Sequence, residues 1–204
     1  MAKGAGATRL LGAPMPHSYE QYVSERQRLG TINNGLDYYN RKSGGFVIFE
    51  EGHLTPTRTN PEFQFAKELA RLGYPVYLTP ESAKKGGVSF RLGPTGNPTF
   101  PDARVGRYSL TYYEQRTPTS DNAKYGALTA LQHASNKGVK LAAIYDKHGI
   151  LTKESIQKGI DWYEHIRTTK TGNNLIHLKG VLVVNKRHEV YWHDMETSGI
   201  KWWE

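Results

Sequence analysis

The chain has 204 residues, of which 37% are hydrophobic and 23% charged, so it can bury the core of one sizeable domain. Lys and Arg number 27 against 19 Asp and Glu, and the net charge of +8 favours nucleic acid or another polyanion as a partner. The absence of cysteine excludes disulfides and thiolate metal sites, and it fits a reducing cytoplasm. No apolar run approaches the roughly 20 residues that a membrane helix needs.

The sequence pattern of the N-terminal half predicts a leader followed by helices and strands. Residues 1–17 are rich in Gly, Ala and Pro and predict a flexible leader, so that one domain would span 18–204. The elements that follow are a helix at 18–29, a strand at 46–50, a helix at 60–72, and strands at 74–79 and 88–92. The 60–72 helix has the clearest signals, because Asn60 is a good N-cap and Pro61 suits the first helical position.

The C-terminal half begins with a predicted hairpin whose strands are 100–105 and 108–114, turned at Gly106 and Arg107. The next elements are a helix at 121–136, a strand at 139–145, a helix at 152–166, and a last hairpin formed by 176–185 and 189–193. This order predicts an α/β fold with a mixed central β-sheet flanked by helices.

Acidic residues fall at informative places in this pattern. Asp102 begins the first strand of the 100–114 hairpin, and Glu114 ends the second. Glu62 lies in the first turn of the preceding helix. Carboxylates that converge from neighbouring strands can hold a hard divalent cation such as Mg²⁺ or Mn²⁺. In a basic protein, such a cation points to phosphodiester cleavage.

Glu62, the Pro101-Asp102 pair and the Glu114-Gln115-Arg116 run together resemble the motif of the PD-(D/E)XK nuclease superfamily. Over roughly residues 46–145, the chain is most similar to the C-terminal nuclease domains of contact-dependent growth-inhibition toxins and related polymorphic toxins. The resemblance implies a restriction-endonuclease-like sheet, with Glu62, Asp102 and Glu114 as Mg²⁺ or Mn²⁺ ligands. The chain departs from the family pattern at Arg116, where the family usually has lysine.

Other residues are candidates for binding nucleic acid around this motif. Arg116 is always charged and suits a phosphate, while Lys124 or Lys140 would replace the missing lysine in space. Tyr112 and Tyr113 face opposite sides of their strand, so one is expected in the core while Tyr112 is a candidate to stack on a base. Two further candidates stay open: His53 could act as a base, and Glu68 competes with Glu62 on the same helix.

The leading hypothesis is a metal-dependent endonuclease that acts on DNA or RNA, as a toxin with an acidic immunity protein as partner. Its site of action would be the cytoplasm, in a target cell if the protein is a delivered toxin. One alternative is a metal-independent ribonuclease that uses His53 or His133 in acid–base chemistry. The other is a non-catalytic nucleic-acid-binding or phage-related protein with a nuclease-like fold.

Overall fold

The computed structural model describes residues 10–29, 36–53, 57–93, 95–106, 111–119 and 123–196. The helices in this part of the chain are α2 (Tyr19–Arg28), α3 (Pro61–Arg71), α4 (Ala123–Lys137) and α5 (Lys153–Thr169), with a 3₁₀ turn, η1 (Ala83–Lys85). The strands are β1 (Tyr38–Tyr39), β2 (Phe46–Phe49), β3 (Pro75–Leu78), β4 (Arg91–Leu92), β5 (Pro98–Thr99), β6 (Ala103–Val105), β7 (Thr111–Arg116), β8 (Leu141–Asp146), β9 (Gly180–Asn185) and β10 (Val190–Asp194).

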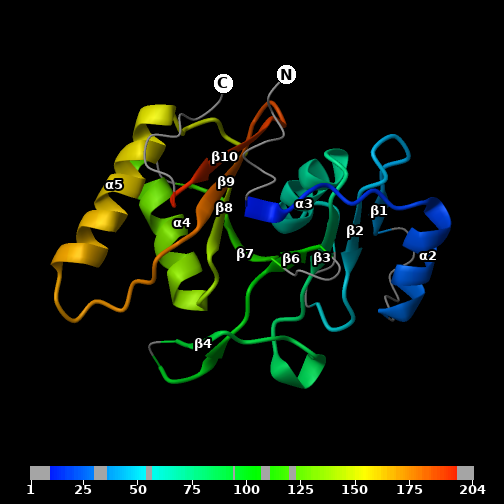
Figure 1. Ribbon diagram of the computed structural model, residues 1–204, viewed down its shortest axis with the longest axis horizontal. Helices are drawn as coiled ribbons and strands as arrows, with labels where there is room; N and C mark the ends of the chain where they lie inside the picture. Colours follow the sequence, from blue (N-terminus) through cyan, green and yellow to red (C-terminus); the bar gives the residue numbers. More distant parts are fainter. Residues whose placement is uncertain are drawn as a thin grey trace.

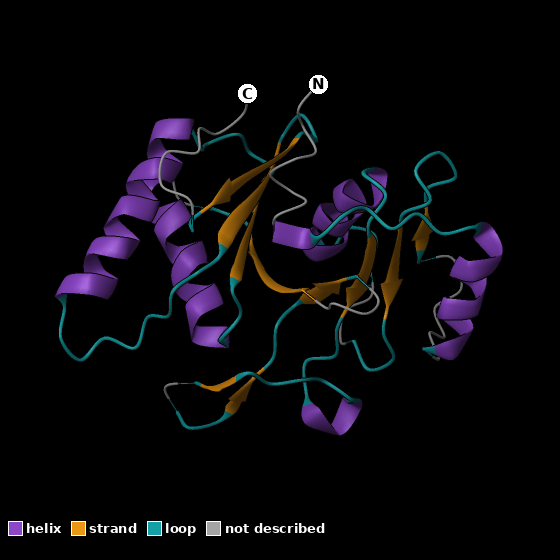
Figure 2. Ribbon diagram, in the orientation of Figure 1, coloured by secondary structure: helices purple, strands orange, loops and turns teal. Residues whose placement is uncertain are grey.

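A mixed eight-stranded sheet in the order β1-β2-β3-β6-β7-β8-β9-β10 forms the centre of the fold (Figure 2). The pairings β2–β3, β7–β8 and β8–β9 are parallel. The strands β1, β6 and β10 pair antiparallel with their neighbours. The predicted α/β class and mixed sheet are therefore confirmed. A separate two-stranded sheet joins β4 to β5.

One face of the sheet is apolar along its whole width. Alternate residues of the strands, such as Phe49, Leu78 and Tyr113, pack there against Phe65 and Leu69 of α3 in a single cluster. Gly45 lets α3 come close to β2, since a Cβ at this position would lie 2.0 Å from the carbonyl oxygen of Ala70. This continuous core fixes the position of α3 relative to the strand ends.

The opposite face is divided between two groups of helices. At the β1–β3 end, Tyr22 of α2 packs on Phe46 and Tyr77. At the β8–β10 end, α4 and α5 cover Ala142 and Val181. Figure 1 shows these groups at opposite ends of the sheet, with the β4 segment beneath its middle. On that middle portion, β6 and β7 carry polar side chains in place of apolar ones.

A partly buried ion pair lies on this middle portion, on the side of β2 and β3. Arg104 of β6 forms an ion pair with Glu50, with Nε 2.6 Å from Oε1, and its guanidinium lies 3.9 Å from the ring centre of Tyr77. Because the two charges neutralise each other, this pair offers no net charge to a ligand. Further basic side chains, Arg116 of β7 and Lys137 of α4, lie along the same face beside Glu114.

The residues predicted to cap α2 and α3 form N-terminal capping hydrogen bonds in the structure. The side chain of Asn60 accepts a hydrogen bond from the backbone N–H of Glu62, with Pro61 at the first helical position. Ser18 and Gln21 form a reciprocal capping box at the start of α2. The predicted boundaries of these helices are correct to within a few residues.

Two expectations about the fold need correction, and one strand has no counterpart among the predicted elements. The leader was expected to reach residue 17, but Leu10 and Leu11 are buried in the main core, so the packed chain begins earlier. The strand expected at 88–92 is limited to Arg91–Leu92, which pairs outside the main sheet. The strand β1 was not predicted, because two residues give no periodicity to detect. The expected turn at Arg107 lies outside the described residues.

None of the helices in the described ranges is long and apolar enough to cross a membrane.

Candidate functional site

The pairing of β6 with β7 brings Asp102 and Glu114 together. Ala103 pairs with Tyr113, so continuing the antiparallel register by one residue places Asp102 across from Glu114. Directly opposed residues of an antiparallel pair project from the same face of the sheet. Beyond the last paired residue, Asp102 Oδ2 accepts a hydrogen bond of 2.7 Å from the backbone N–H of Gln115. The carboxylate of Asp102 thus occupies the place of a backbone acceptor at the end of the ladder.

Glu62 approaches the same place from α3. The first turn of this helix lies at the strand edge where β2, β3 and β7 end, because α3 packs across those strands. The charge of Glu62 acts on both Asp102 and Glu114. Its own carboxylate lies 3.2 Å from Nε2 of His53, a buried residue in the turn after β2. The three predicted acids therefore share one electrostatic site.

The carboxyl group of Glu114 is the most enclosed part of this site, with the residue 2% exposed. Lys137 Nζ lies 3.7 Å from its Oε2, and Arg116 Nη2 lies 3.7 Å from its Oε1. Both distances exceed those of good hydrogen bonds. Oε2 has no hydrogen-bond partner among the described residues. An enclosed acceptor without a donor is costly unless a proton or a cation occupies it.

The pKa values of the two strand acids reflect this enclosure. Burial, followed by the charge of Glu62, raises the pKa of Asp102 to about 7. Asp102 keeps some solvent-accessible surface as a residue, but protein atoms surround its carboxyl group closely. Burial, followed by the charge of Asp102, raises the pKa of Glu114 to about 9. The pair therefore holds protons more firmly than ordinary carboxylates do. A bound divalent cation would, like a proton, relieve the repulsion between the neighbouring negative charges.

Two residues of α4 complete the site: Lys137, which the sequence did not indicate, and His133, which was a candidate only for the alternative ribonuclease. Lys137 Nζ donates to the carbonyl oxygen of Phe100, at 2.5 Å, beside the segment that carries Asp102. Arg116 Nη2 donates to Nδ1 of His133, at 2.6 Å. Burial and the charges of Arg116 and Lys137 lower the pKa of His133, which keeps it neutral and able to accept this bond. His133 and Lys137 are one helical turn apart, so they share a face of α4. This spacing could have indicated from the sequence that both residues reach the same site.

The remaining predicted residues have different surroundings. Lys140 is exposed just before β8, and the side chain of Lys124 lies outside what the structure describes. Tyr112 is partly buried, with its ring edge-on to Phe90 at 4.7 Å between centroids, while Tyr113 is fully buried. Glu68 is buried away from this site and contacts Arg71 and His188. Its contacts are therefore structural, joining α3 to the β9–β10 turn.

A ready-made cage for a metal ion is not present in the described part of the chain, where no three His, Asp or Glu side chains are grouped to hold one. The donor chemistry of the Asp102–Glu114 pair nevertheless suits a hard cation, since both are buried carboxylates and one oxygen of Glu114 lacks a hydrogen-bond partner among the residues that the structure describes. Glu62 is hydrogen-bonded to His53. The residues present therefore fit a cation held chiefly by the strand pair.

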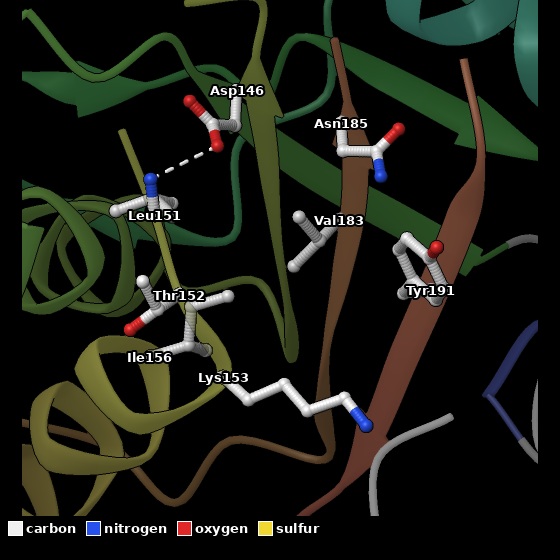
Figure 3. A pocket seen from close by; sticks show the side chains of 8 residues that line it. All are labelled: Asp146, Leu151, Thr152, Lys153, Ile156, Val183, Asn185 and Tyr191. Carbon is white, nitrogen blue, oxygen red and sulfur yellow. Dashed lines mark hydrogen bonds between the residues drawn. The ribbon is translucent and has the colours of Figure 1, made fainter. Parts of the chain in front are cut away.

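A cavity of about 340 Å³ lies elsewhere, at the ends of β8 and β9 next to the start of α5 (Figure 3). The residues that line it are Asp146, Leu151, Thr152, Lys153, Ile156, Val183, Asn185 and Tyr191. Both carboxylate oxygens of Asp146 already accept backbone hydrogen bonds, from Ile150 and Leu151. None of the site carboxylates lines this cavity, so it does not coincide with the site of the perturbed pKa values. We place the chemistry at the carboxylates, because the charges gather there.

The fold and the site together define a mixed α/β protein with a buried carboxylate pair and basic side chains at the ends of its parallel strands. Comparison with protein-family models and with curated proteins finds no match. Among solved structures, a chain of a CdiA-CT/CdiI toxin and immunity complex from Burkholderia pseudomallei is similar, with 18% identity and a TM-score of 0.46. The match covers 74% of this chain and 99% of that chain. A likeness at this level says nothing about activity.

Proposed function

We propose that this protein is a metal-dependent nuclease that hydrolyses phosphodiester bonds in DNA or RNA. The observation that carries the proposal is the convergence of Asp102 and Glu114 at one strand edge, buried and with raised pKa values. Clusters of carboxylates with strongly shifted pKa values are typical of functional sites. The sequence motif that contains these residues supports the same assignment.

In this proposal, Asp102 and Glu114 hold Mg²⁺ or Mn²⁺, with the charge of Glu62 adding to the attraction. A bound divalent cation lowers the pKa of a coordinated water and neutralises phosphate charge. The two carboxyl groups give up their protons when the cation binds, because only the ionised forms are good ligands. Metal affinity should therefore rise as the pH rises through the pKa values of the pair.

Lys137 and Arg116 supply the positive charge that the phosphate requires. Both lie beside Glu114, and Arg116 is held in place by its hydrogen bond to His133. Arginine binds phosphate in a bidentate manner, whereas lysine acts as a mobile point charge and proton donor. Lys137 thus takes the place of the lysine that the family motif has at position 116, since it approaches the motif glutamate from α4.

The proposed function has a direct test. Purified protein is incubated with single-stranded and duplex DNA and with RNA, in Mg²⁺ or Mn²⁺ or in excess EDTA. Cleavage should require the metal and should be lost in Asp102→Ala and in Glu114→Ala. Cleavage that persists in EDTA and in both variants would exclude a metal-dependent site at these residues.

A second candidate has specific support, because two histidines contact the site. His53 is hydrogen-bonded to Glu62, and His133 accepts from Arg116. A histidine beside a carboxylate is a common general base, so these contacts allow a metal-independent ribonuclease. EDTA-resistant cleavage of RNA that is lost in His53→Gln or His133→Gln would favour it over the metal-dependent site.

The toxin assignment is part of the proposal and rests on the sequence resemblance. A nuclease toxin that acts in the bacterial cytoplasm should stop growth when it is expressed from a tightly regulated promoter, and Asp102→Ala should not. The net charge of +8 would favour an immunity protein with an acidic binding surface. Normal growth of cells that contain soluble wild-type protein would argue against a toxin.

A further inference from the structure

Beside the carboxylates, an extended segment presents three large apolar side chains to solvent. It belongs to residues 82–93 and 95–99, which carry η1, β4 and β5 and are called the arm here. Val88, Phe90 and Leu92 are 47%, 49% and 61% exposed. Leu92 belongs to β4, and Val88 and Phe90 belong to the segment that leads into it. Exposed apolar side chains gathered in this way indicate a binding surface.

The arm is fixed to the body of the protein, so these side chains have a defined position. Arg91 Nη1 donates to the carbonyl oxygen of Ser135 in α4, at 2.9 Å, and Thr99 Oγ1 donates to the carbonyl oxygen of Arg91 at 3.0 Å. A Cβ on Gly138, just after α4, would lie 2.8 Å from Cβ of Arg91 and 3.2 Å from that of Phe90. This contact is close enough that only glycine, at φ +76°, suits the position.

The arm is continuous with the proposed catalytic site. The ring of Phe90 packs edge-on against Tyr112, which lies two residues before Glu114 on the same face of β7. Two residues of a strand span roughly 7 Å, so neighbouring units of one bound polymer would contact both places. Lys140, two residues after Gly138, is also exposed.

The charge of the arm suits a polyanion. Between residues 82 and 99 the sequence has three basic residues, Lys84, Lys85 and Arg91, and no acidic residue. Both lysines are exposed. Basic charge beside exposed aromatic and aliphatic side chains matches a ligand that has both phosphates and accessible base faces.

We infer that the arm binds the unpaired bases of a single-stranded nucleic acid, with Phe90 as the stacking residue. This inference deepens the proposed nuclease function and rests on it. In a duplex the base faces are stacked inside and only phosphates and groove edges meet a protein, so an apolar arm gains little from it. In a single strand the bases are free to stack on Phe90 while the lysines contact phosphates. The substrate class of the site is then single-stranded DNA or RNA.

Binding in EDTA, measured by fluorescence anisotropy, tests this inference without any cleavage. Labelled single-stranded DNA, single-stranded RNA and duplex DNA are titrated with wild-type protein and with Phe90→Ala, Phe90→Leu and Phe90→Trp. We expect tighter binding of a single strand than of the duplex. Phe90→Ala and Phe90→Leu should weaken single-strand binding about tenfold, and Phe90→Trp should retain it, because a stacked aromatic ring supplies the affinity. The comparison of DNA with RNA identifies the preferred sugar.

Leu92→Ala and Trp162→Ala serve as a second variant and a matched control. Leu92 is 61% exposed, so its loss should weaken binding without affecting folding. Trp162 is an exposed aromatic residue on α5, stacked on His165 and outside the arm, and its loss should leave binding unchanged. Circular dichroism and thermal melts confirm that each variant folds.

Three results would overturn the inference. They are unchanged single-strand affinity in both Phe90→Ala and Leu92→Ala, equal or tighter binding of the duplex, and a wild-type dimer that Phe90→Ala dissociates without a change in nucleic-acid affinity. The last result would make the arm an interface between copies of this chain. A protein that binds single strands through Phe90 but cleaves none with any metal would refute the proposed nuclease and leave the arm assignment intact. If Phe90→Ala changed neither cleavage nor single-strand binding, the arm assignment would be refuted and the proposed nuclease would remain.

Discussion

Glu114→Gln should make the metal-free protein more stable at alkaline pH. Because the pKa of Glu114 is raised in the folded state to about 9, against about 4.3 in an unfolded chain, folding favours its protonated form. Below about pH 4 both states are protonated and no penalty arises. As the pH rises from there toward 9, the unfolded state ionises first, so the free energy of unfolding falls. A glutamine has the shape of the protonated acid and does not titrate.

The size of the effect follows from the burial of the carboxyl group. At pH 8 the interval between the pKa of Glu114 in the unfolded chain and the pH is about four units, and each unit costs the wild type up to about 1.36 kcal/mol of unfolding free energy. Relaxation of the charged site reduces this loss, so the stability gained by Glu114→Gln should be on the order of 2–3 kcal/mol. For a domain of this size, that corresponds to a rise of roughly 5–10 °C in melting temperature. At pH 5 the wild type and the variant should melt within a few degrees of each other.

Thermal melts in EDTA at pH 5, 6.5 and 8 measure this effect, followed by titration with Mg²⁺ or Mn²⁺ at pH 8. The metal should raise the melting temperature of the wild type and leave that of Glu114→Gln unchanged. Glu81→Gln is the matched control, because Glu81 is exposed and should alter neither the pH dependence nor the response to metal. A Glu114→Gln variant that is less stable than the wild type at pH 8 in EDTA would refute the reasoning.

Three further predictions concern the site and the fold. Lys137→Ala should slow single-turnover cleavage about 100-fold or more, since a preorganised positive charge is lost, while Lys153→Ala on α5 should leave the rate unchanged. Asp102→Asn should abolish cleavage without lowering the melting temperature, because an amide oxygen still accepts from the backbone N–H of Gln115; a large loss of stability would contradict this. Gly45→Ala should destabilise the protein by about 3 kcal/mol in urea unfolding, as its Cβ would collide with α3, and a change under 1 kcal/mol would show that the backbone relaxes.

The sequence predicted those parts of the fold that depend on local signals. Asn60 and Pro61 fixed the start of α3, and the alternation around Asp102 and Glu114 fixed a hairpin whose register then places the two acids opposite each other. The strand β1 lacks such a signal, since it has two residues and depends on its pairing with β2. Leu10 and Leu11 form a short apolar pair within a Gly- and Ala-rich stretch, so composition alone concealed their place in the core.

The candidate site was predictable where the motif is contiguous and unpredictable where it depends on packing. Lys137 is the last residue of α4, the helix that follows β7 in the chain. It comes close to Glu114 only because of the way α4 packs on the sheet. Lys140, one of the two lysines expected to replace the motif lysine, lies only three residues further along the chain. That short distance carries it past the end of α4 and into solvent at the start of β8. A charge in the last turn of a helix gives no indication in the sequence of which neighbour it will meet.

The site draws its parts from both sides of the β6–β7 connection. Glu62 and Asp102 precede residue 106, while Glu114 and Lys137 follow residue 111. A partly synthesised chain that ends before β7 would thus carry two of the three acids and neither of the neighbouring cations on β7 and α4. Neither fragment from a cut in this connection would have a working centre until it met the other. The proposed activity would damage the nucleic acid of the cell that makes the protein. Because the site is complete only after β7 and α4 have been synthesised, the growing chain would be inactive until then.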